Sequence, residues 1–283
     1  MALISIANDQ LKVTISTLGA ELQTITDKEG RERLWNGDPE FWSGRAYVLF
    51  PVAGAFRDDY YELDGVRYDM PKHGFARTAE WQVEEVTADK AVFLLTEKHP
   101  GFPFDYAFRA IYTLKENALE VTYRMSSFDS RPFYYSVGCH EGYMTPEGIE
   151  DYEIVFDEVE DLEHYTVVGS CNSHDTVMIG KNTRVMPLKS EYFDVDALVF
   201  RNLKSRGVTL QGGKLGYKIR VDFPEHPVLM FWQKPGGPFI CIECWCNGPD
   251  FLDAPANIEE KPGHIRIENG QTIDRTHTIT FIG

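Results

Sequence analysis

The stretch LKVTIST, residues 11–17, alternates apolar and polar side chains, with apolar residues at Leu11, Val13 and Ile15. Successive side chains of a β-strand point to opposite faces, so this spacing places the three apolar residues on one face. Such a pattern is typical of a strand with one buried and one solvated face. The stretch therefore predicts a half-buried β-strand.

The same two-residue period recurs far along the chain. In ALEVTYRM, residues 118–125, Leu119, Val121 and Tyr123 share one face, and THTITFI, residues 276–282, repeats the pattern. Sequences that favour turns separate such segments. They are DKEG (27–30), ELDG (62–65), KENA (115–118), QGG (211–213) and IENGQ (267–271). Many short strands joined by polar turns predict an all-β sandwich or barrel.

Helical patterning is sparse along the whole chain. The best candidate is a short turn around DPEFW, residues 38–42, which Asp38 could cap. No segment has the composition of a linker or a low-complexity tract, and no internal repeat is evident. Because all-β chains of this length can fold as one unit, we expect a single domain over residues 1–283.

Composition limits the classes of partner and compartment. The 283 residues carry a net charge of −16 with a pI of about 4.9, which disfavours binding to nucleic acids and to anionic membranes. The first residues lack a basic segment, and no stretch approaches the roughly 18 apolar residues of a membrane helix. Five cysteines, an odd number, favour free thiols in a reduced, cytoplasmic protein.

Three cysteines surround one carboxylate in FICIECWC, residues 239–246. Cys241 and Cys244 have Cys-x-x-Cys spacing, but a zinc ribbon needs a second such pair, and these two side chains point to opposite faces of a strand. We therefore expect buried thiols and no metal site. Glu243 shares a face with Cys241 and Trp245. Because an isolated buried carboxylate is costly, Glu243 is either structurally paired or functional.

Two histidines lie in segments that could border a cleft. MPKHGFARTAEW, residues 70–81, contains His73 and Arg77, and FYYSVGCHEGYM, residues 133–144, contains His140 at the end of an apolar strand. A histidine at a strand end, just before a glycine, is well placed to face a cleft. The alternatives are a surface-loop histidine for His73 and a hydrogen-bonded core histidine for His140.

Further polar candidates follow two apolar segments. Asp194 and Asp196 share a face in YFDVDALVFRNL, residues 192–203, and either could instead serve a turn or a cap. Arg57 comes directly after LFPVAGAF, residues 49–56, and could clamp a polar ligand or pair with a neighbouring aspartate.

These residue types suit acid–base chemistry on a sugar. The chain lacks the glycine-rich nucleotide motifs, Gly-x-Ser-x-Gly and His-Glu-x-x-His. Trp and Tyr present apolar faces to sugar rings, and carboxylates, His and Arg form directional hydrogen bonds to hydroxyls. Opening a hemiacetal ring needs one proton removed and one supplied. A carboxylate and an imidazole can do both near neutral pH.

Several segments occur in one order and together resemble the aldose 1-epimerase (galactose mutarotase) family, in particular its LacX-like branch. They are GAELQTITDKEGRERLWNGDPEFW (19–42), LFPVAGAF (49–56), DGVRYDMPKHGFAR (64–77), FYYSVGCHEGY (133–143), DALVF (196–200), FICIECWCN (239–247) and ENGQTIDRTHTITFI (268–282). The resemblance implies a β-supersandwich fold of the galactose mutarotase type with a sugar cleft, and no metal or other cofactor.

The resemblance also implies roles for single residues. Glu243 resembles the general base that takes the proton of the anomeric hydroxyl, and His140 resembles the general acid that protonates the ring oxygen. His73 resembles the second histidine, which binds and polarises that oxygen. Asp196 resembles the aspartate that holds sugar hydroxyls. Trp245 is expected to form a wall beside the sugar ring.

The chain departs from the family pattern at two positions. Ala55 stands where an arginine that contacts the sugar is usual, so we expect Arg57 or Arg77 to bind the substrate instead. Glu141 stands where this branch usually has a proline. Its charge should raise the pKa of His140 if the two side chains approach closely.

The expected function is interconversion of the α and β anomers of a free aldose, such as a hexose, by a monomer or a homodimer. The alternatives are a non-catalytic carbohydrate-binding protein, a glycoside hydrolase that pairs Glu243 with Asp196, and a hexose-6-phosphate 1-epimerase. A hydrolase needs two carboxyl groups about 5–9.5 Å apart, and the two histidines argue against it. A phosphate site needs a cluster of cations, which the acidic composition disfavours.

Overall fold

The computed structural model describes residues 1–214, 216 and 218–283. Its main feature is an antiparallel sheet of 14 strands. In sheet order the strands are β4 (Ala46–Leu49), β12 (Gly138–Met144), β19 (Phe239–Trp245), β18 (Val228–Trp232), β15 (Leu198–Phe200), β13 (Tyr152–Val168), β16 (Gly207–Gly212), β17 (Lys218–Asp222), β21 (Thr272–Ile282), β10 (Ala118–Ser127), β9 (Tyr106–Lys115), β8 (Lys90–Leu95) and β7 (Gln82–Val86), and β14 (Cys171–Pro187) pairs with β13 off this path.

Smaller elements complete the described part of the chain. The small sheets are β1 (Leu3–Ala7) with β2 (Leu11–Ser16) and β3 (Leu22–Asp27), β5 (Tyr60–Leu63) with β6 (Val66–Asp69), and β11 (Phe133–Tyr135) with β20 (Ile265–Ile267). The 3₁₀-helices are η1 (Arg57–Asp59), η2 (Ala76–Thr78), η3 (Ile149–Asp151), η4 (Ser190–Phe193) and η5 (Ile258–Glu260). None of the described helices is long and apolar enough to cross a membrane.

The prediction of an all-β fold is confirmed, and the alternation seen in the sequence is the reason. In β10 the apolar side chains of Leu119, Val121 and Tyr123 are buried, while the residues between them are partly exposed. The segment that begins at Leu11 forms β2, with Val13 and Ile15 also in the core. Burial of apolar surface gains a free energy of about 25 cal/mol per Å², and this gain drives the apolar faces of such strands to pack together.

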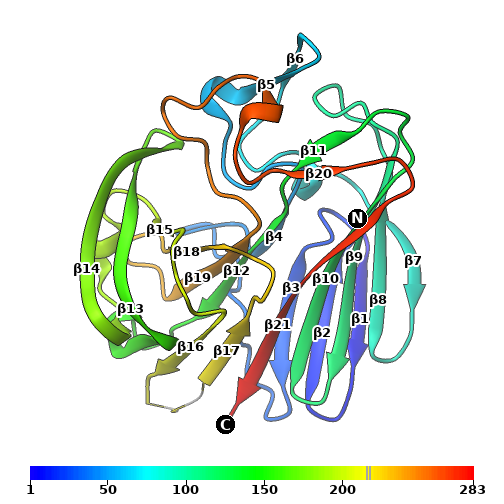
Figure 1. The fold of residues 1–283 in the computed structure, drawn as a ribbon. Coiled ribbons are helices and arrows are strands. Elements are labelled where there is room, and N and C mark those ends of the chain that lie inside the picture. The colour runs from blue at the N-terminus through cyan, green and yellow to red at the C-terminus, as the bar shows by residue number, and fades with distance from the viewer. Residues whose placement is uncertain (215, 217) are drawn as a thin grey trace.

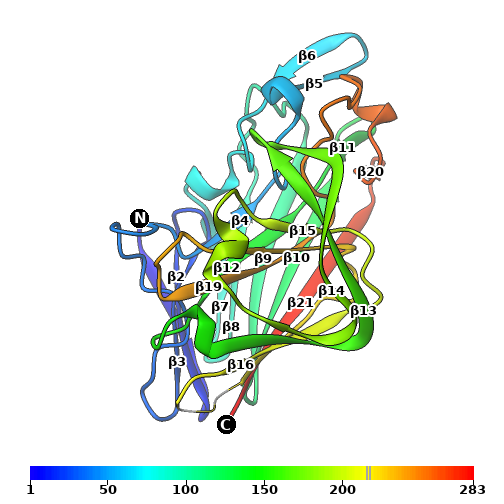
Figure 2. The same cartoon turned by 90° about the vertical axis from the view of Figure 1, so that its left-hand side faces the viewer.

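The large sheet folds back on itself. Six strands separate β12 from β21 in the sheet order, yet the side chains of Glu141 and His277 meet across the core. Figure 1 shows β12, β18 and β19 on one side of the molecule, β7 to β10 on the other, and β21 running between them. Figure 2 shows the long β13–β14 hairpin curving along the molecule. The two inner faces enclose the hydrophobic core, as in a β-sandwich.

The expected turn at DPEFW is present, without a helix. The backbone amides of Phe41 and Trp42 donate to the carbonyl oxygen of Asp38, and the Asp38 carboxylate accepts from the amide of Glu40 at 3.0 Å.

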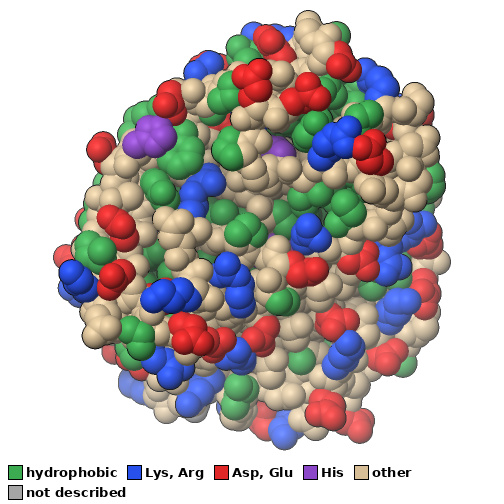
Figure 3. Space-filling view, in the orientation of Figure 1, with side chains coloured by type: hydrophobic (Ala, Val, Ile, Leu, Met, Phe, Trp, Pro, Cys, Tyr) green, Lys and Arg blue, Asp and Glu red, His purple; other side chains and the backbone are tan. Residues whose placement is uncertain are grey.

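The surface of the protein carries charges of both signs. Figure 3 shows acidic and basic side chains interspersed over the face that Figure 1 presents.

Candidate active site

A pocket of about 320 Å³ lies at β12, β18 and β19, on the face of the sheet that points away from β21. Loops and the ends of β4 and β13 close its sides. Its lining residues are Trp42, Tyr47, Gly54, Lys72, His73, Arg77, His140, Val167, Ser170, Asp196, Ala197, Met230, Trp232, Glu243, Trp245 and Pro249. We refer to this pocket as the candidate site.

A larger and more open depression of about 740 Å³ lies elsewhere on the surface. It is lined by Asn8, Asp9, Gln10, Leu11, Asp27, Lys28, Glu29, Arg33, Glu116, Asn117, Phe281 and Gly283, and these include no histidine. Size alone does not make a site, whereas titratable groups that converge in a concave pocket do favour one. The smaller pocket is therefore the stronger candidate.

The pairing of β12 with β19 brings His140 and Glu243 together. Gly138 pairs with Trp245 and Glu141 with Ile242, so the same register sets His140 opposite Glu243. The His140 Nε2 lies 3.5 Å from the Glu243 Oε2. This Oε2 and the His140 Nδ1 are buried without a hydrogen-bond partner among the described groups. The site thus holds polar atoms that a ligand or water could satisfy.

The regular hydrogen-bond ladder between β12 and β19 is interrupted beside these two residues. The Cys244 amide donates to the Sγ of Cys139 at 3.2 Å instead of to a carbonyl oxygen. The carbonyl oxygen of Cys139 accepts from the indole Nε1 of Trp245 at 2.8 Å. Trp245 is therefore held in place as a wall of the candidate site. The three cysteines of the 239–246 stretch are free and buried, as expected.

His73 reaches the candidate site from a left-handed turn. Its φ is 67°, and its amide donates to the carbonyl oxygen of Gly54 at 2.6 Å. The Gly54 amide donates in turn to the His73 Nδ1 at 3.2 Å, so the neutral ring carries its proton on Nε2. A Cβ on Gly74 would lie 2.1 Å from the carbonyl oxygen of Phe50, which is why this turn requires glycine.

Aromatic rings enclose His140 on several sides. The Trp42 ring lies 4.8 Å from the imidazole, centre to centre, with an angle of 30° between the planes. Trp232 and Tyr47 approach it edge-on at 5.7 Å and 6.1 Å. His73 lies 5.8 Å away and nearly perpendicular. These rings exclude water from the imidazole and present apolar surface to a ligand.

Burial controls the protonation of the candidate site. It raises the pKa of Glu243 well above its ordinary value of 4.5, while the nearby Lys72 ammonium opposes that rise. It lowers the pKa of His140 to about 3 and, together with the neighbouring His140, lowers the pKa of His73 well below 6.5. Burial therefore favours a neutral carboxyl group on Glu243 and a neutral imidazole on His140.

The buried histidines predict that the protein loses stability in acid. Burial lowers the pKa of His73, His140, His226 and His264, so below about pH 6.5 the unfolded chain binds protons that the folded chain does not. The contribution of these four histidines to stability is fully present above that pH and is lost as the pH drops toward their lowered pKa values. Urea unfolding between pH 7 and pH 4 should show a loss on the order of a few kcal/mol.

A single substitution separates this effect from the titration of carboxylates. Both ring nitrogens of His226 are buried without a partner in the described structure. In the variant His226→Phe, the free energy of unfolding should fall less steeply between pH 7 and pH 4, because one of the titrating groups is gone. If the free energy of unfolding of this variant fell as steeply with decreasing pH as that of the wild type, the assignment of the acid destabilisation to the buried histidines would be contradicted.

Of the other predicted site residues, two line the candidate site and one does not. Arg77 and Asp196 line the candidate site, and the Asp196 Oδ1 accepts from the Ala197 amide at 2.8 Å, which leaves Oδ2 for a ligand. Arg57 is absent from the lining residues. Its Nε lies 3.4 Å from the Asp58 carboxylate, so the alternative of a pair with a neighbouring aspartate is the one observed.

Sequence reasoning missed several residues of the candidate site. Trp42, Tyr47 and Trp232 surround His140, and Lys72 lines the pocket beside His73. A signal for Lys72 was present, because this cation directly precedes His73 in the chain. The aromatic residues gave no comparable signal, since core strands contain many such residues.

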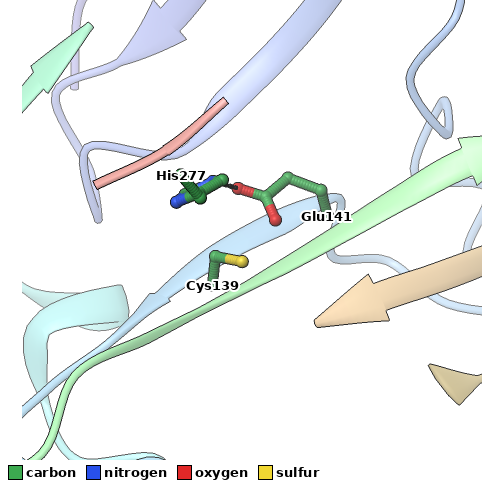
Figure 4. Close-up of side chains that lie close together, drawn as sticks. All are labelled: Cys139, Glu141 and His277. Carbon is green, nitrogen blue, oxygen red and sulfur yellow. Dashed lines mark hydrogen bonds and ion pairs between the residues drawn. The ribbon is translucent and has the colours of Figure 1, made fainter. Parts of the chain in front are cut away.

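A second cluster lies behind the candidate site, on the core side of β12. Figure 4 shows Cys139, Glu141 and His277, with the Glu141 Oε1 at 3.0 Å from the His277 Nε2. All three side chains are buried. Burial by itself lowers the pKa of His277, but Cys139 and Glu141 outweigh it, so this pKa is raised well above 6.5. Glu141 and His277 therefore form a buried ion pair.

The condition under which Glu141 would raise the pKa of His140, a close approach of the two side chains, is not met. Adjacent residues of a strand point to opposite faces, so Glu141 turns to the core and pairs with His277 while His140 turns to the candidate site. The pKa of His140 falls to about 3 because burial of the ring has the largest effect on it.

Among the residues that the structure describes, two groups of side chains have the spacing of metal ligands. They are Cys139, Glu141 and His277 in the core, and His140, Cys241 and Glu243 at the candidate site. Burial raises the pKa of the Cys139 and Cys241 thiols well above 9. Metals bind the thiolate, which burial disfavours here. Each group offers three ligand atoms, whereas structural zinc takes four.

The sequence and the fold both match known proteins. The family model described as aldose 1-epimerase matches residues 2–280. The chain therefore belongs to the aldose 1-epimerase family, which supports an enzyme of the isomerase type. Within the family it is 30% identical over 296 aligned positions to protein LacX (chromosomal) of Lactococcus lactis subsp. lactis, with 99% of each chain covered. The predicted resemblance to the LacX-like branch is thereby confirmed.

Solved structures show the same fold over the whole length. A galactose mutarotase related enzyme from Lactobacillus acidophilus superimposes with a TM-score of 0.92 at 27% identity, covering 100% of this chain and 98% of that one. A galactose mutarotase-like protein from Lactobacillus casei ATCC 334 gives 0.93 at 25% identity, covering 99% and 100%. The predicted galactose mutarotase-like β-sandwich is thus confirmed.

Proposed function

We propose that the protein interconverts the α and β anomers of a free aldose by acid–base opening and closing of the sugar ring. The observation that carries this proposal is the approach of His140 to Glu243, at 3.5 Å, inside a pocket with aromatic walls. The pocket of about 320 Å³ falls within the usual range for small-molecule sites, roughly 300–1,000 Å³. Family membership supports the same reaction class.

The protonation of the pair suits this reaction. Glu243 and His140 together hold one proton in the neutral state that burial favours. Moving that proton from the carboxyl group to the imidazole produces a carboxylate and an imidazolium without changing the net charge. In that form the carboxylate can accept the proton of the anomeric hydroxyl, and the imidazolium can donate its proton to the ring oxygen.

The proton count then balances over a full cycle. As the ring opens, O1–H loses its proton to Glu243, the bond between C1 and the ring oxygen breaks, and His140 protonates that oxygen. The pair has now returned to the neutral state that burial favours. Rotation about C1–C2 turns the aldehyde over. The same two transfers in reverse close the ring with O1 on the other face, and no redox step is required.

The other residues bind and orient the sugar in this scheme. The Nε2–H of His73 can donate a hydrogen bond to the ring oxygen, because Nδ1 already accepts from Gly54. The free Oδ2 of Asp196 can accept from sugar hydroxyls. Trp245 and Trp42 supply apolar surface for the ring.

NMR exchange spectroscopy of the anomeric protons tests the proposal. Catalytic amounts of the protein should increase the rate of α–β exchange of at least one aldose above the spontaneous rate. Polarimetry on freshly dissolved α-D-glucose and α-D-galactose gives an independent measurement. Binding of a sugar without any acceleration would instead support the alternative of a non-catalytic carbohydrate-binding protein.

The pH dependence of kcat/KM should be bell-shaped, because the scheme needs one proton on the pair. Below about pH 3 both His140 and Glu243 are protonated, and no base remains. Above the pKa of Glu243, which burial raises well above 4.5, the shared proton is lost and no acid remains. Activity should thus decline at both extremes. A rate that rises steadily with pH, as hydroxide catalysis does, would contradict the scheme.

A further inference from the structure

Cys139 directly precedes the proposed acid His140 on β12, and its buried side chain belongs to the hydrophobic core. The register of β12 with β19 sets it opposite Cys244, which directly follows the proposed base Glu243. Along its other edge, β12 pairs without interruption with β4 over residues 138–141. The irregular pairing of β12 is therefore confined to the edge at which the proposed acid and base meet.

Two hydrogen bonds from side chains replace the backbone ladder at this point. The indole Nε1 of Trp245 donates to the carbonyl oxygen of Cys139 at 2.8 Å, and the Cys244 amide donates to the Sγ of Cys139 at 3.2 Å. In a regular antiparallel ladder, a carbonyl oxygen of the opposite strand accepts from such an amide. The indole thus occupies the carbonyl oxygen that stands opposite Cys244, and the thiol of the same residue satisfies the remaining amide.

Gly138 allows the indole to reach this carbonyl oxygen. A Cβ on Gly138 would lie 2.5 Å from the Cδ1 of Trp245, which is closer than side chains approach one another. A glycine inside a strand is typical of such a close approach. Trp245 also belongs to an apolar cluster that includes Leu49, Val199 and Met230. Packing and the glycine together therefore hold the indole against β12.

The thiol of Cys139 suits its position beside the Cys244 amide. Burial raises the pKa of this thiol well above 9, so it stays neutral, and its sulfur is a weak acceptor. An alanine would offer no acceptor, and a buried amide without an acceptor is costly. A serine would offer an oxygen, but its shorter bond to Cβ holds that oxygen farther from the amide.

Both hydrogen bonds act on the backbone that carries the proposed acid and base. The Cys244 amide belongs to the peptide unit that directly follows the Cα of Glu243. The carbonyl group of Cys139 belongs to the peptide unit that directly precedes the Cα of His140. Cys139 therefore connects the two peptide units from which these side chains project. The distance of 3.5 Å between the His140 Nε2 and the Glu243 Oε2 depends on this connection.

We propose that Cys139 is a positioning residue that sets the separation of His140 and Glu243 through its thiol and its carbonyl oxygen. Cys139 is buried and does not line the candidate site, so it acts without contact to the sugar. The inference rests on the proposed function, in which these two side chains exchange protons with the sugar. A misplacement of about 1 Å in a catalytic group can lower the rate on the order of 10²-fold.

Anomer exchange on D-glucose and D-galactose tests the role of Cys139. The variants are Cys139→Ala, Cys139→Ser, Trp245→Phe and the double variant Cys139→Ala/Trp245→Phe. Rates over a range of sugar concentrations separate kcat from KM, and urea unfolding of the same samples shows that each variant is folded. Cys246→Ala is the matched control, because Cys246 is also a buried free thiol and does not line the candidate site.

Cys139→Ala should lower kcat roughly 10- to 100-fold, because the acid and the base lose their relative position. It should change KM less than about 3-fold, because the residues that bind the sugar remain. Cys139→Ser should keep more of the wild-type kcat than Cys139→Ala, since its oxygen can accept from the amide. Cys246→Ala should leave both constants unchanged.

The Trp245→Phe background gives the sharpest measurement. Without the indole, the carbonyl oxygen of Cys139 is free to accept from the Cys244 amide, so the backbone ladder can close and the thiol is no longer needed. Trp245→Phe should itself lower kcat. In this background, however, Cys139→Ala should cost less than about 3-fold, a failure of additivity that only coupled residues show.

The outcomes separate this proposal from the proposed function. A large loss of kcat in Cys139→Ala that nearly disappears in the Trp245→Phe background supports the proposal. A wild-type kcat in Cys139→Ala, or an equal loss in both backgrounds, overturns it and leaves the proposed function intact. If Cys139→Ser loses as much kcat as Cys139→Ala, the hydrogen bond to the side chain is not the cause, and the proposal also falls. No acceleration of either sugar by the wild type overturns both.

Discussion

The variant Glu243→Gln is expected to lower kcat for anomer exchange by about 10²–10⁴-fold, the usual contribution of a positioned acid–base group. The amide has nearly the shape of the carboxyl group but cannot accept the proton of the anomeric hydroxyl. Burial already favours the neutral form of Glu243, so the variant replaces one uncharged side chain with another. The free energy of unfolding should therefore not decrease. NMR exchange rates and urea unfolding measure the two quantities on one sample.

Glu85→Gln is the matched control for this variant. Glu85 lies on β7, pairs with Lys90 at 2.7 Å and does not line the candidate site. Its substitution should leave anomer exchange unchanged. Equal rates for Glu243→Gln and the wild type would remove Glu243 from the mechanism. A large loss of stability in Glu243→Gln would show instead that the carboxylate is a structural group.

The variant Glu141→Ala should destabilise the folded protein by about 3–5 kcal/mol, because it leaves the charge of His277 buried and unpaired. The Glu141 Oε1 is 3.0 Å from the His277 Nε2, and both side chains are within the core. Urea unfolding of the variant and the wild type at pH 6 gives the difference directly. Glu85→Ala, which breaks the exposed pair with Lys90, should cost only about 0–1 kcal/mol.

The ion pair of Glu141 with His277 also makes the free energy of unfolding depend on pH, and the direction of this dependence can be derived. The pKa of His277 is raised in the folded state, so its contribution to stability is fully present below about pH 6.5 and is lost as the pH rises through the raised value. The wild type should lose this contribution in alkaline solution, and Glu141→Ala should lose less. An identical alkaline decline in both proteins would contradict a charged His277.

Local patterns carried most of what could be predicted about the fold. The alternation at Leu11, Val13 and Ile15 identifies a strand because the burial of one face is a property of a few consecutive residues. The order of strands in the large sheet is not local. That β12 faces β21 depends on how six intervening strands curve, and no short pattern in either strand records it.

The candidate site was predictable to the extent that a residue was unusual in its surroundings. Glu243 is a carboxylate in an apolar strand, and His140 ends another such strand, so both were noticed. Trp42 and Trp232 were missed because an aromatic residue that lines a pocket has the same sequence signature as one in the core. Strand parity would have turned Glu141 away from His140, but it was not applied there, and the partner of Glu141, His277, is 136 residues away.

β21 has a consequence for how the protein folds. This strand is hydrogen-bonded to β17 along one edge and to β10 along the other, and it carries His277 to the back of β12. Pairings between segments so distant in the chain form slowly, because a long loop has to close before any contact compensates for the lost entropy. Until residues 272–282 dock, β10 and β17 present open edges that can pair with other chains. Aggregation during folding should therefore compete with completion of the sheet behind β12.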